Sequence, residues 1–86
     1  MNELAILLHS GQQKCQALQA AYPSSVTLQS IGKQIDYLLE LANGTSTDRS
    51  CLKDIIIGVQ TAREVEALDQ DAAEVFYQIA SAAKTM

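Results

Sequence analysis

Apolar residues recur along the start of the chain at steps of three and four, which is the spacing of one face of an α-helix. Asn2 is a suitable N-cap for this first helix. Pro23 ends it, because a proline disfavours helical geometry at the residue before it. The predicted inner face consists of Leu4, Leu7, Leu8, Gly11, Cys15, Leu18 and Tyr22.

A second helical face follows the proline. Ser24 or Ser25 can cap this helix through a side-chain oxygen, and the pair Asn43-Gly44 supplies a left-handed stop at its far end. Its apolar residues again follow helical spacing, which predicts an inner face formed by Leu28, Ile31, Ile35, Leu38, Leu39 and Ala42.

The stretch TDRSCLKDIIIGVQTAREVE, residues 47–66, contains the run IIIGV, which would suit a strand as well as a helix. The wider spacing of apolar residues favours a helix capped by Thr47 or Asp48, with Ile56 and Val59 buried. Gly58 inside this helix costs about 1 kcal/mol relative to alanine, which indicates a close helix crossing. The predicted face is Leu52, Ile55, Ile56, Val59 and Ala62, after which it turns away from the core.

Asp69 can cap a fourth helix, with Asp71 and Glu74 in its first turns. Its predicted inner face is Ala72, Val75, Phe76, Ile79 and Ala83. Four helices joined by three short connections predict an all-α fold, a small antiparallel bundle of four helices. We expect one domain over residues 1–86, because 86 residues supply one modest core.

Charge is distributed unevenly over these helices. The formal net charge is −4. Residues 1–63 hold five acidic and five basic residues, whose charges cancel. The net charge therefore arises after residue 63, where Lys84 is the one basic residue. The acidic residues there are Glu64, Glu66, Asp69, Asp71 and Glu74. Such a run is explained by a solvated helix end as well as by a binding surface. The net negative charge argues against nucleic acid or an anionic membrane as the partner and favours a basic protein surface.

Cys15 and Cys51 are two separate thiols without CxxC spacing or a disulfide framework, which is typical of a reducing compartment. Both lie on or beside predicted apolar faces, so we expect buried, unreactive thiols. The start of the chain lacks the features of a signal peptide, and no segment approaches the roughly 20 apolar residues of a membrane span. We therefore expect a cytoplasmic protein.

Side chains suited to catalysis are scarce. His9 is the one histidine, which excludes a two-histidine zinc pattern, and we expect it at the surface. His9 and Cys15 point in different directions on one helix, and acidic residues two positions apart do not face each other. The glycines are isolated, so no phosphate-binding loop is formed. We expect no enzyme activity, no metal and no cofactor.

A longer pattern surrounds the third predicted helix. Asp48-Arg49-Ser50-x-Leu52 leads through an apolar run to Gly58 and then to Ala62-Arg63-Glu64. This string resembles the immunity proteins that neutralise NAD(P)+ glycohydrolase toxins of bacterial type VI secretion. The resemblance covers residues 22–77, and its other members are Tyr22-Pro23, Leu28, Lys33-Gln34-x-x-Tyr37, Asp69 and Phe76-Tyr77. The last helix departs from the family pattern, with a shorter run between Asp69 and the aromatic pair.

The resemblance implies an immunity protein that binds the C-terminal domain of its cognate toxin and blocks the active site, a role that needs no catalytic residues. The candidate partner-binding residues are Glu64, Glu66, Asp69, Asp71, Glu74, Arg49, Gln34 and Tyr37. A structural polar role is an equal interpretation for Gln34 and Tyr37, and Arg49 can pair with an acid or lie in the interface. Asp48 and Ser50 are interpreted as hydrogen-bonding residues at a helix start.

Other interpretations stay open. An immunity protein against a contact-dependent inhibition nuclease would suit the acidic end equally well, because a nuclease active site is often basic. A helical adaptor unrelated to toxins would have a partner encoded far from this gene. A small enzyme would show a saturable activity that is lost on mutation of His9 or Cys51. A weak homodimer is also left open.

Overall fold

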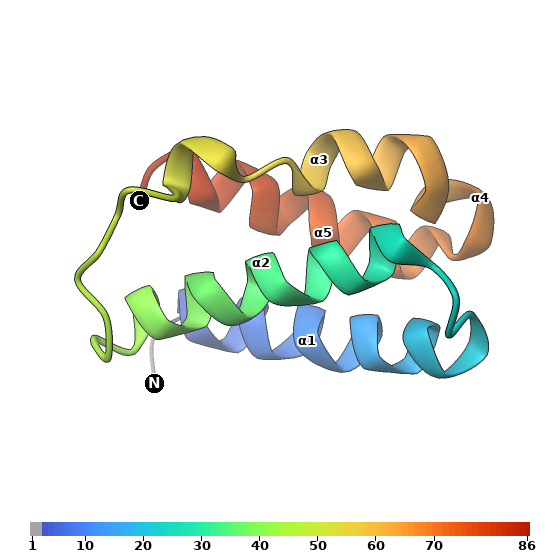
Figure 1. Ribbon diagram of the computed structural model, residues 1–86, viewed down its shortest axis with the longest axis horizontal. Coiled ribbons are helices and arrows are strands. Elements are labelled where there is room, and N and C mark those ends of the chain that lie inside the picture. The colour runs from blue at the N-terminus through green and yellow to red at the C-terminus, as the bar shows by residue number, and fades with distance from the viewer. Residues whose placement is uncertain (1–2) are drawn as a thin grey trace.

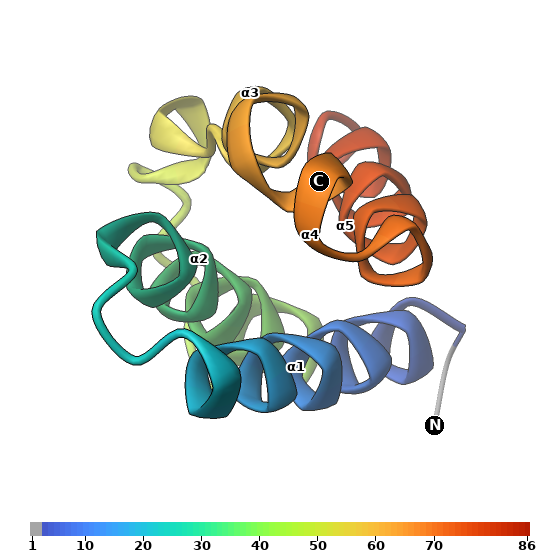
Figure 2. The same cartoon turned by 90° about the vertical axis from the view of Figure 1, so that its right-hand side faces the viewer.

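The computed structural model describes residues 3–86, and this part of the chain is all-α, as predicted (Figure 1). Two layers of helices pack against each other (Figures 1 and 2). One layer holds α1 (Glu3–Ala21) and α2 (Val26–Ala42). The other holds α5 (Gln70–Ala83) and a composite third helix made of α3 (Ile57–Gln60), the π-helical turn η2 (Thr61–Val65) and α4 (Glu66–Leu68). None of the described helices is both long and apolar enough to cross a membrane.

The first connection follows the sequence prediction closely. Helix α1 ends at Ala21, two positions before Pro23. Ser25 caps α2, because its Oγ accepts the backbone N–H of Leu28 at 3.1 Å. The predicted cap of α1, Asn2, lies outside the described residues.

The far end of α2 is closed by the predicted left-handed glycine. Gly44 has φ +77°, a conformation that glycine adopts without a Cβ penalty. The backbone N–H of Gly44 reaches the carbonyl of Leu41 at 3.3 Å, and that of Thr45 reaches the carbonyl of Glu40 at 3.0 Å. These two bonds form a Schellman motif, which satisfies carbonyls that the helix end would otherwise leave free.

The core lies between the two layers and is formed largely by the predicted faces of α1, α2 and α5. The largest fully buried side chains from these helices are Leu8, Leu28, Ile31, Ile35, Leu38, Phe76 and Ile79. Tyr22 was predicted on the inner face of the first helix, but it is 44% exposed because it lies beyond the end of α1.

The third helix begins later than the sequence predicted, at Ile57 rather than near Asp48. The preceding segment holds a short 3₁₀ turn, η1 (Leu52–Asp54), followed by Ile55 in an extended conformation. Asp48 caps no helix; its Oδ1 accepts the backbone N–H of Ser50 at 2.9 Å, a local turn that competes with helix formation. The β-branched isoleucines that follow also have reduced helix propensity.

The buried face of the third helix is therefore shifted. Ile56 and Val59, predicted in the core, are 49% and 54% exposed. Ile57, Thr61 and Val65 are fully buried in their place, and Ala62 is exposed. The Thr61 hydroxyl donates to the Ile57 carbonyl at 2.7 Å, so this polar side chain enters the core with its donor satisfied. The face leaves the core after Val65, because Leu68 is 40% exposed.

Two further expectations for this half of the chain are confirmed. A Cβ added at Gly58 would lie 3.4 Å from the Cβ of Ala80, so α3 and α5 approach each other closely at the glycine. Asp69 caps α5, and its Oδ1 accepts the backbone N–H of Ala72 at 3.1 Å.

The two thiols differ in environment. Cys15 is buried, as predicted, and its S–H donates to the Leu28 carbonyl at 3.3 Å. Burial, with a smaller effect of the Asp36 charge, raises the pKa of the Cys15 thiol to about 11. The prediction for Cys51 is wrong: it is exposed, because it belongs to the connection before η1 rather than to a helix face. His9, on α1, is partly exposed.

Candidate protein-binding site

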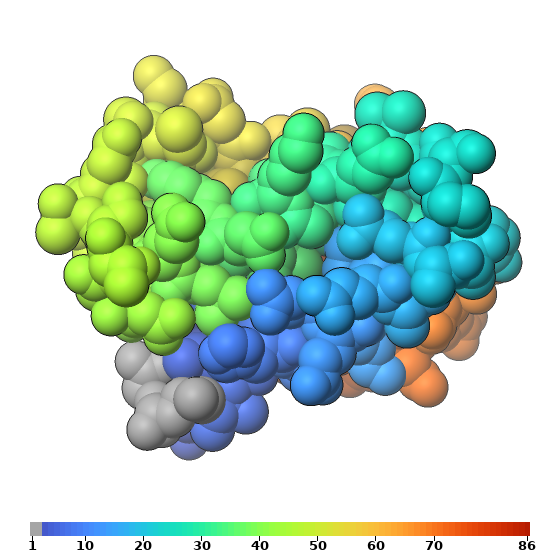
Figure 3. Space-filling model, turned by 60° about the horizontal axis from the view of Figure 1, so that its bottom comes forward, coloured from blue at the N-terminus to red at the C-terminus, as the bar shows by residue number. Residues whose placement is uncertain are grey.

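A long connection, residues 43–56, links α2 to α3, and we call it the strap. It closes the end of the molecule opposite the α1–α2 turn, as Figures 1 and 3 show. The hydroxyl of Tyr37 on α2 donates to the Asp48 carbonyl at 2.7 Å. Hydrogen bonding from the Ser50 side chain and backbone N–H lowers the pKa of Asp48.

Gln34 fixes the other end of the strap. Its Oε1 accepts the backbone N–H of Ile56 at 2.8 Å, immediately before α3 begins. Its Nε2 lies 2.8 Å from the Gln60 Oε1 and 3.1 Å from the Ser30 Oγ. Gln34 therefore acts as a cap for α3 that is supplied by another helix.

Gln34→Ala should lower the free energy of unfolding by about 1–3 kcal/mol, because the Ile56 N–H and the Gln60 amide would lose partners. Urea denaturation measures this loss, and amide hydrogen exchange at Ile56 should accelerate. The matched control is Gln13→Ala, at an exposed position of α1, which should leave stability within about 0.5 kcal/mol of the parent. Equal stability of the two variants would show that the Gln34 bonds contribute nothing.

Gln34 and Tyr37 thus have the structural polar role that the sequence left as one of two interpretations. Arg49 lies exposed on the strap, and its backbone carbonyl accepts the N–H of Leu52. For all three, contact with a partner stays a prediction.

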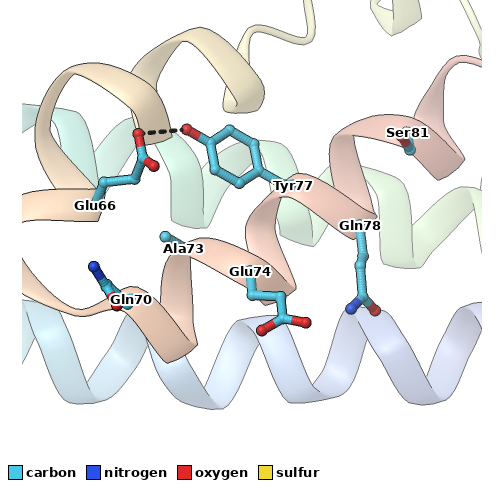
Figure 4. A pocket seen from close by; sticks show the side chains of 7 residues that line it. All are labelled: Glu66, Gln70, Ala73, Glu74, Tyr77, Gln78 and Ser81. Carbon is cyan, nitrogen blue, oxygen red and sulfur yellow. Dashed lines mark hydrogen bonds between the residues drawn. The ribbon is translucent and has the colours of Figure 1, made fainter.

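An open hollow of about 650 Å³ lies over α4 and the outer side of α5, and we call it the acidic hollow. Its lining consists of Glu66, Gln70, Ala73, Glu74, Tyr77, Gln78 and Ser81. Figure 4 shows Glu66 and Tyr77 turned toward each other, with Glu74 and Gln78 on the opposite side of α5 from the Tyr77 ring. Apart from Glu66 and Glu74, the side chains of this lining are uncharged.

The Tyr77 hydroxyl donates to the Glu66 Oε2 at 2.9 Å and joins α5 to α4. Partial desolvation of the phenol, together with its hydrogen bond to Glu66, raises the pKa of Tyr77. The raised pKa agrees with a phenol that keeps its proton and donates a hydrogen bond to the Glu66 carboxylate.

The structure separates the acidic residues that the sequence grouped together. Glu66 and Glu74 share the acidic hollow. Glu64 instead borders a different hollow at the α1–α2 turn, beside Tyr22 and Leu68. Asp69 is occupied as the cap of α5, and Asp71 is exposed.

Sequence reasoning missed a second surface, a groove of about 430 Å³ between α3 and the C-terminal part of α5. Its lining is mostly apolar and consists of Leu52, Ile55, Ile56, Gly58, Val59, Tyr77, Ala80, Ser81, Ala83 and Lys84. The signal was present in the sequence as the run IIIGV, but this run was assigned to the core. Tyr77 and Ser81 line both the groove and the acidic hollow, so the two surfaces adjoin each other.

Within residues 3–86, no group of three or more His, Cys, Asp and Glu side chains is arranged to hold a metal ion. The surfaces that remain are open and combine carboxylates with exposed apolar side chains, a combination suited to contact with another protein. By fold and surface, this is a small helical protein with open acidic and apolar surfaces and no described metal site.

Comparison with known families makes this more specific. The sequence model of the Tsi6 family matches residues 7–85, nearly the whole chain. The chain belongs to the Tsi6 family, a family of type VI secretion immunity proteins. No curated protein and no solved structure matches the chain significantly.

Proposed function

We propose that this protein neutralises a cognate secreted toxin by binding the toxin's C-terminal domain and covering its active site, without any catalysis of its own. The observation that carries the proposal is the family match over residues 7–85. The family is associated with an NAD-degrading effector, and we infer that the toxin is an NAD(P)+ glycohydrolase. The action would take place in the cytoplasm, where this substrate is available.

The charge of the acidic hollow supports this partner. A cleft that binds NAD(P)+ must accept the negative charge of its phosphates, which proteins do with basic side chains and helix N-termini. Carboxylates on an inhibitor complement such a cleft and its rim. Glu66 and Glu74 are the acidic residues that share one concave surface here, so we place the contact on them.

Glu74→Lys should slow association with the toxin domain by about threefold or more at low ionic strength, because opposite potentials accelerate encounter. The effect should shrink at high salt, where the Debye length falls from about 10 Å at 0.1 M to about 3 Å at 1 M. Binding kinetics at both salt concentrations measure it. The matched control is Glu40→Lys, the same charge change at an exposed residue near the end of α2.

Glu66→Lys needs its own control, because Glu66 also accepts the Tyr77 hydroxyl. Tyr77→Phe removes that hydrogen bond but keeps both the ring and the carboxylate. If Glu66 enters the toxin cleft, its reversal should accelerate dissociation and cost about 2–5 kcal/mol of binding, whereas Tyr77→Phe should not. Rates within about twofold of the parent for both Glu66→Lys and Glu74→Lys would remove the acidic hollow from the interface.

The nuclease alternative predicts the same salt dependence, since nuclease clefts also carry positive charge. The reaction of the partner toxin separates the two. Loss of NAD(P)+ in the presence of the free toxin domain supports the glycohydrolase, and degradation of RNA or DNA supports a nuclease. The family match favours the type VI glycohydrolase.

A further inference from the structure

The apolar groove between α3 and α5 is bordered by large apolar side chains that are exposed to solvent. Ile56 and Val59 are 49% and 54% exposed and border the same groove. The lining also includes the small residues Gly58 and Ala80, which neighbour each other across the two helices. Single exposed apolar residues are ordinary, but two β-branched side chains over an apolar groove form a candidate contact surface.

The position of the groove indicates what covers it. Tyr77 and Ser81 border both the groove and the acidic hollow, so one molecule lying along α5 would contact both. Ala80 and Ala83 line the groove, whereas Glu74 lines the hollow. The two alanines follow Glu74 by six and nine residues along α5. At a rise of 1.5 Å per residue, this spacing is about 9–14 Å, or roughly two helical turns.

Charge changes along the same line. Glu66 and Glu74 border the hollow, and Lys84 borders the far end of the groove. If a partner segment lies along α5 with a basic group over the hollow, the rest of that segment contacts the apolar surface of the groove. This arrangement matches the anatomy of protein interfaces, in which apolar anchors are flanked by charged rims.

We propose that the groove receives an aliphatic or aromatic side chain of the toxin domain, located about two helical turns from a basic group that sits in the acidic hollow. The proposal rests on the proposed function and adds the apolar half of the interface. The charged half raises the rate of encounter, and the apolar half lengthens the lifetime of the complex.

The test replaces the groove residues by a small polar residue. Ile56→Ser and Val59→Ser should each accelerate dissociation of the toxin domain by about tenfold. This factor corresponds to a loss of about 1.4 kcal/mol of binding free energy, as expected when a buried aliphatic side chain is removed. Association should change little, and the effect should be independent of salt. Circular dichroism should be unchanged, because neither side chain is in the core.

Matched controls are available on other surfaces. Ile6 on α1 is 56% exposed and Val26 at the start of α2 is 76% exposed, and neither lines the groove. Ile6→Ser and Val26→Ser should leave both rates within about twofold of the parent.

The outcomes separate the two proposals. If Ile56→Ser and Val59→Ser bind like the parent while Glu74→Lys binds more slowly, the groove proposal is overturned and the proposed function stands. If the parent chain does not bind the toxin domain, the proposed function itself fails. If the chain alone forms a dimer that Ile56→Ser and Val59→Ser convert to a monomer, the groove is an interface between copies of this chain and its assignment to the toxin is wrong.

Discussion

Ile57→Asp should unfold the chain or leave it with little remaining stability. The Ile57 side chain is fully buried in the core between the two layers of helices. A carboxylate there would be unpaired and removed from water, at a cost of about 3–5 kcal/mol or more. A domain of this size has a total stability of only about 5–15 kcal/mol, so this cost removes much or all of it. Circular dichroism should show loss of helix at room temperature or a strongly reduced melting temperature.

The neighbouring isoleucine provides a sharp control. Ile56→Asp places the same carboxylate one residue earlier, where the side chain is 49% exposed and water can solvate the charge. We expect this variant to fold, with a loss below about 1 kcal/mol. The reverse order, with Ile56→Asp unfolded and Ile57→Asp folded, would mean that the third helix presents its other face to the core.

Phe76→Ala should produce the second large loss of stability. Phe76 is the one phenylalanine of the chain and a fully buried side chain of α5. Its truncation should cost about 3–5 kcal/mol, because apolar contacts are lost and a cavity is left. At about 4–8 °C per kcal/mol, the melting temperature should fall by at least about 12 °C.

Tyr22→Ala is the matched control for this aromatic truncation. Tyr22 lies beyond the end of α1 and is 44% exposed, so its removal should cost about 1 kcal/mol or less. Thermal unfolding of the two variants under identical conditions measures the difference. A loss at Phe76→Ala no greater than that at Tyr22→Ala would contradict the placement of α5 against the core.

Three of the four helices could be predicted from the sequence because their signals are local. The steps of three and four place Leu8, Ile35 and Ile79 on buried faces without reference to any distant residue. Ser25 and Asp69 cap helices through bonds to residues three positions away. Such patterns are complete within one segment, so tertiary contacts did not alter them.

The third helix could not be predicted correctly because its decisive contacts are distant or polar. The run IIIGV offers three isoleucines at adjacent positions, and hydrophobicity alone does not say which one is buried. Thr61 is also buried, with its hydroxyl donating to the Ile57 carbonyl, but a search for apolar residues passes over it because threonine is polar. The start of α3 is set by Gln34, which is 22 positions from Ile56 in the sequence.

The candidate site was predicted in composition but not in arrangement. Charge counting located the acidic segment from Glu64 to Glu74, and the structure brings Glu66 and Glu74 of that segment to one hollow. The other acidic residues of the segment lie elsewhere: Glu64 borders the hollow at the α1–α2 turn, and Asp69 caps α5. The apolar groove depends on the exposure of Ile56 and Val59, which the sequence assigned to the core.

Inhibition of a cognate toxin domain is the most direct test of the proposed function. The purified domain is supplied with NAD(P)+, and nucleotide loss is followed with and without an equimolar amount of this protein. We predict that the protein alone consumes no NAD(P)+ and that its addition stops consumption by the toxin, with Glu40→Lys equally effective. A toxin domain that hydrolyses NAD(P)+ at an undiminished rate in the presence of excess folded protein would contradict the account.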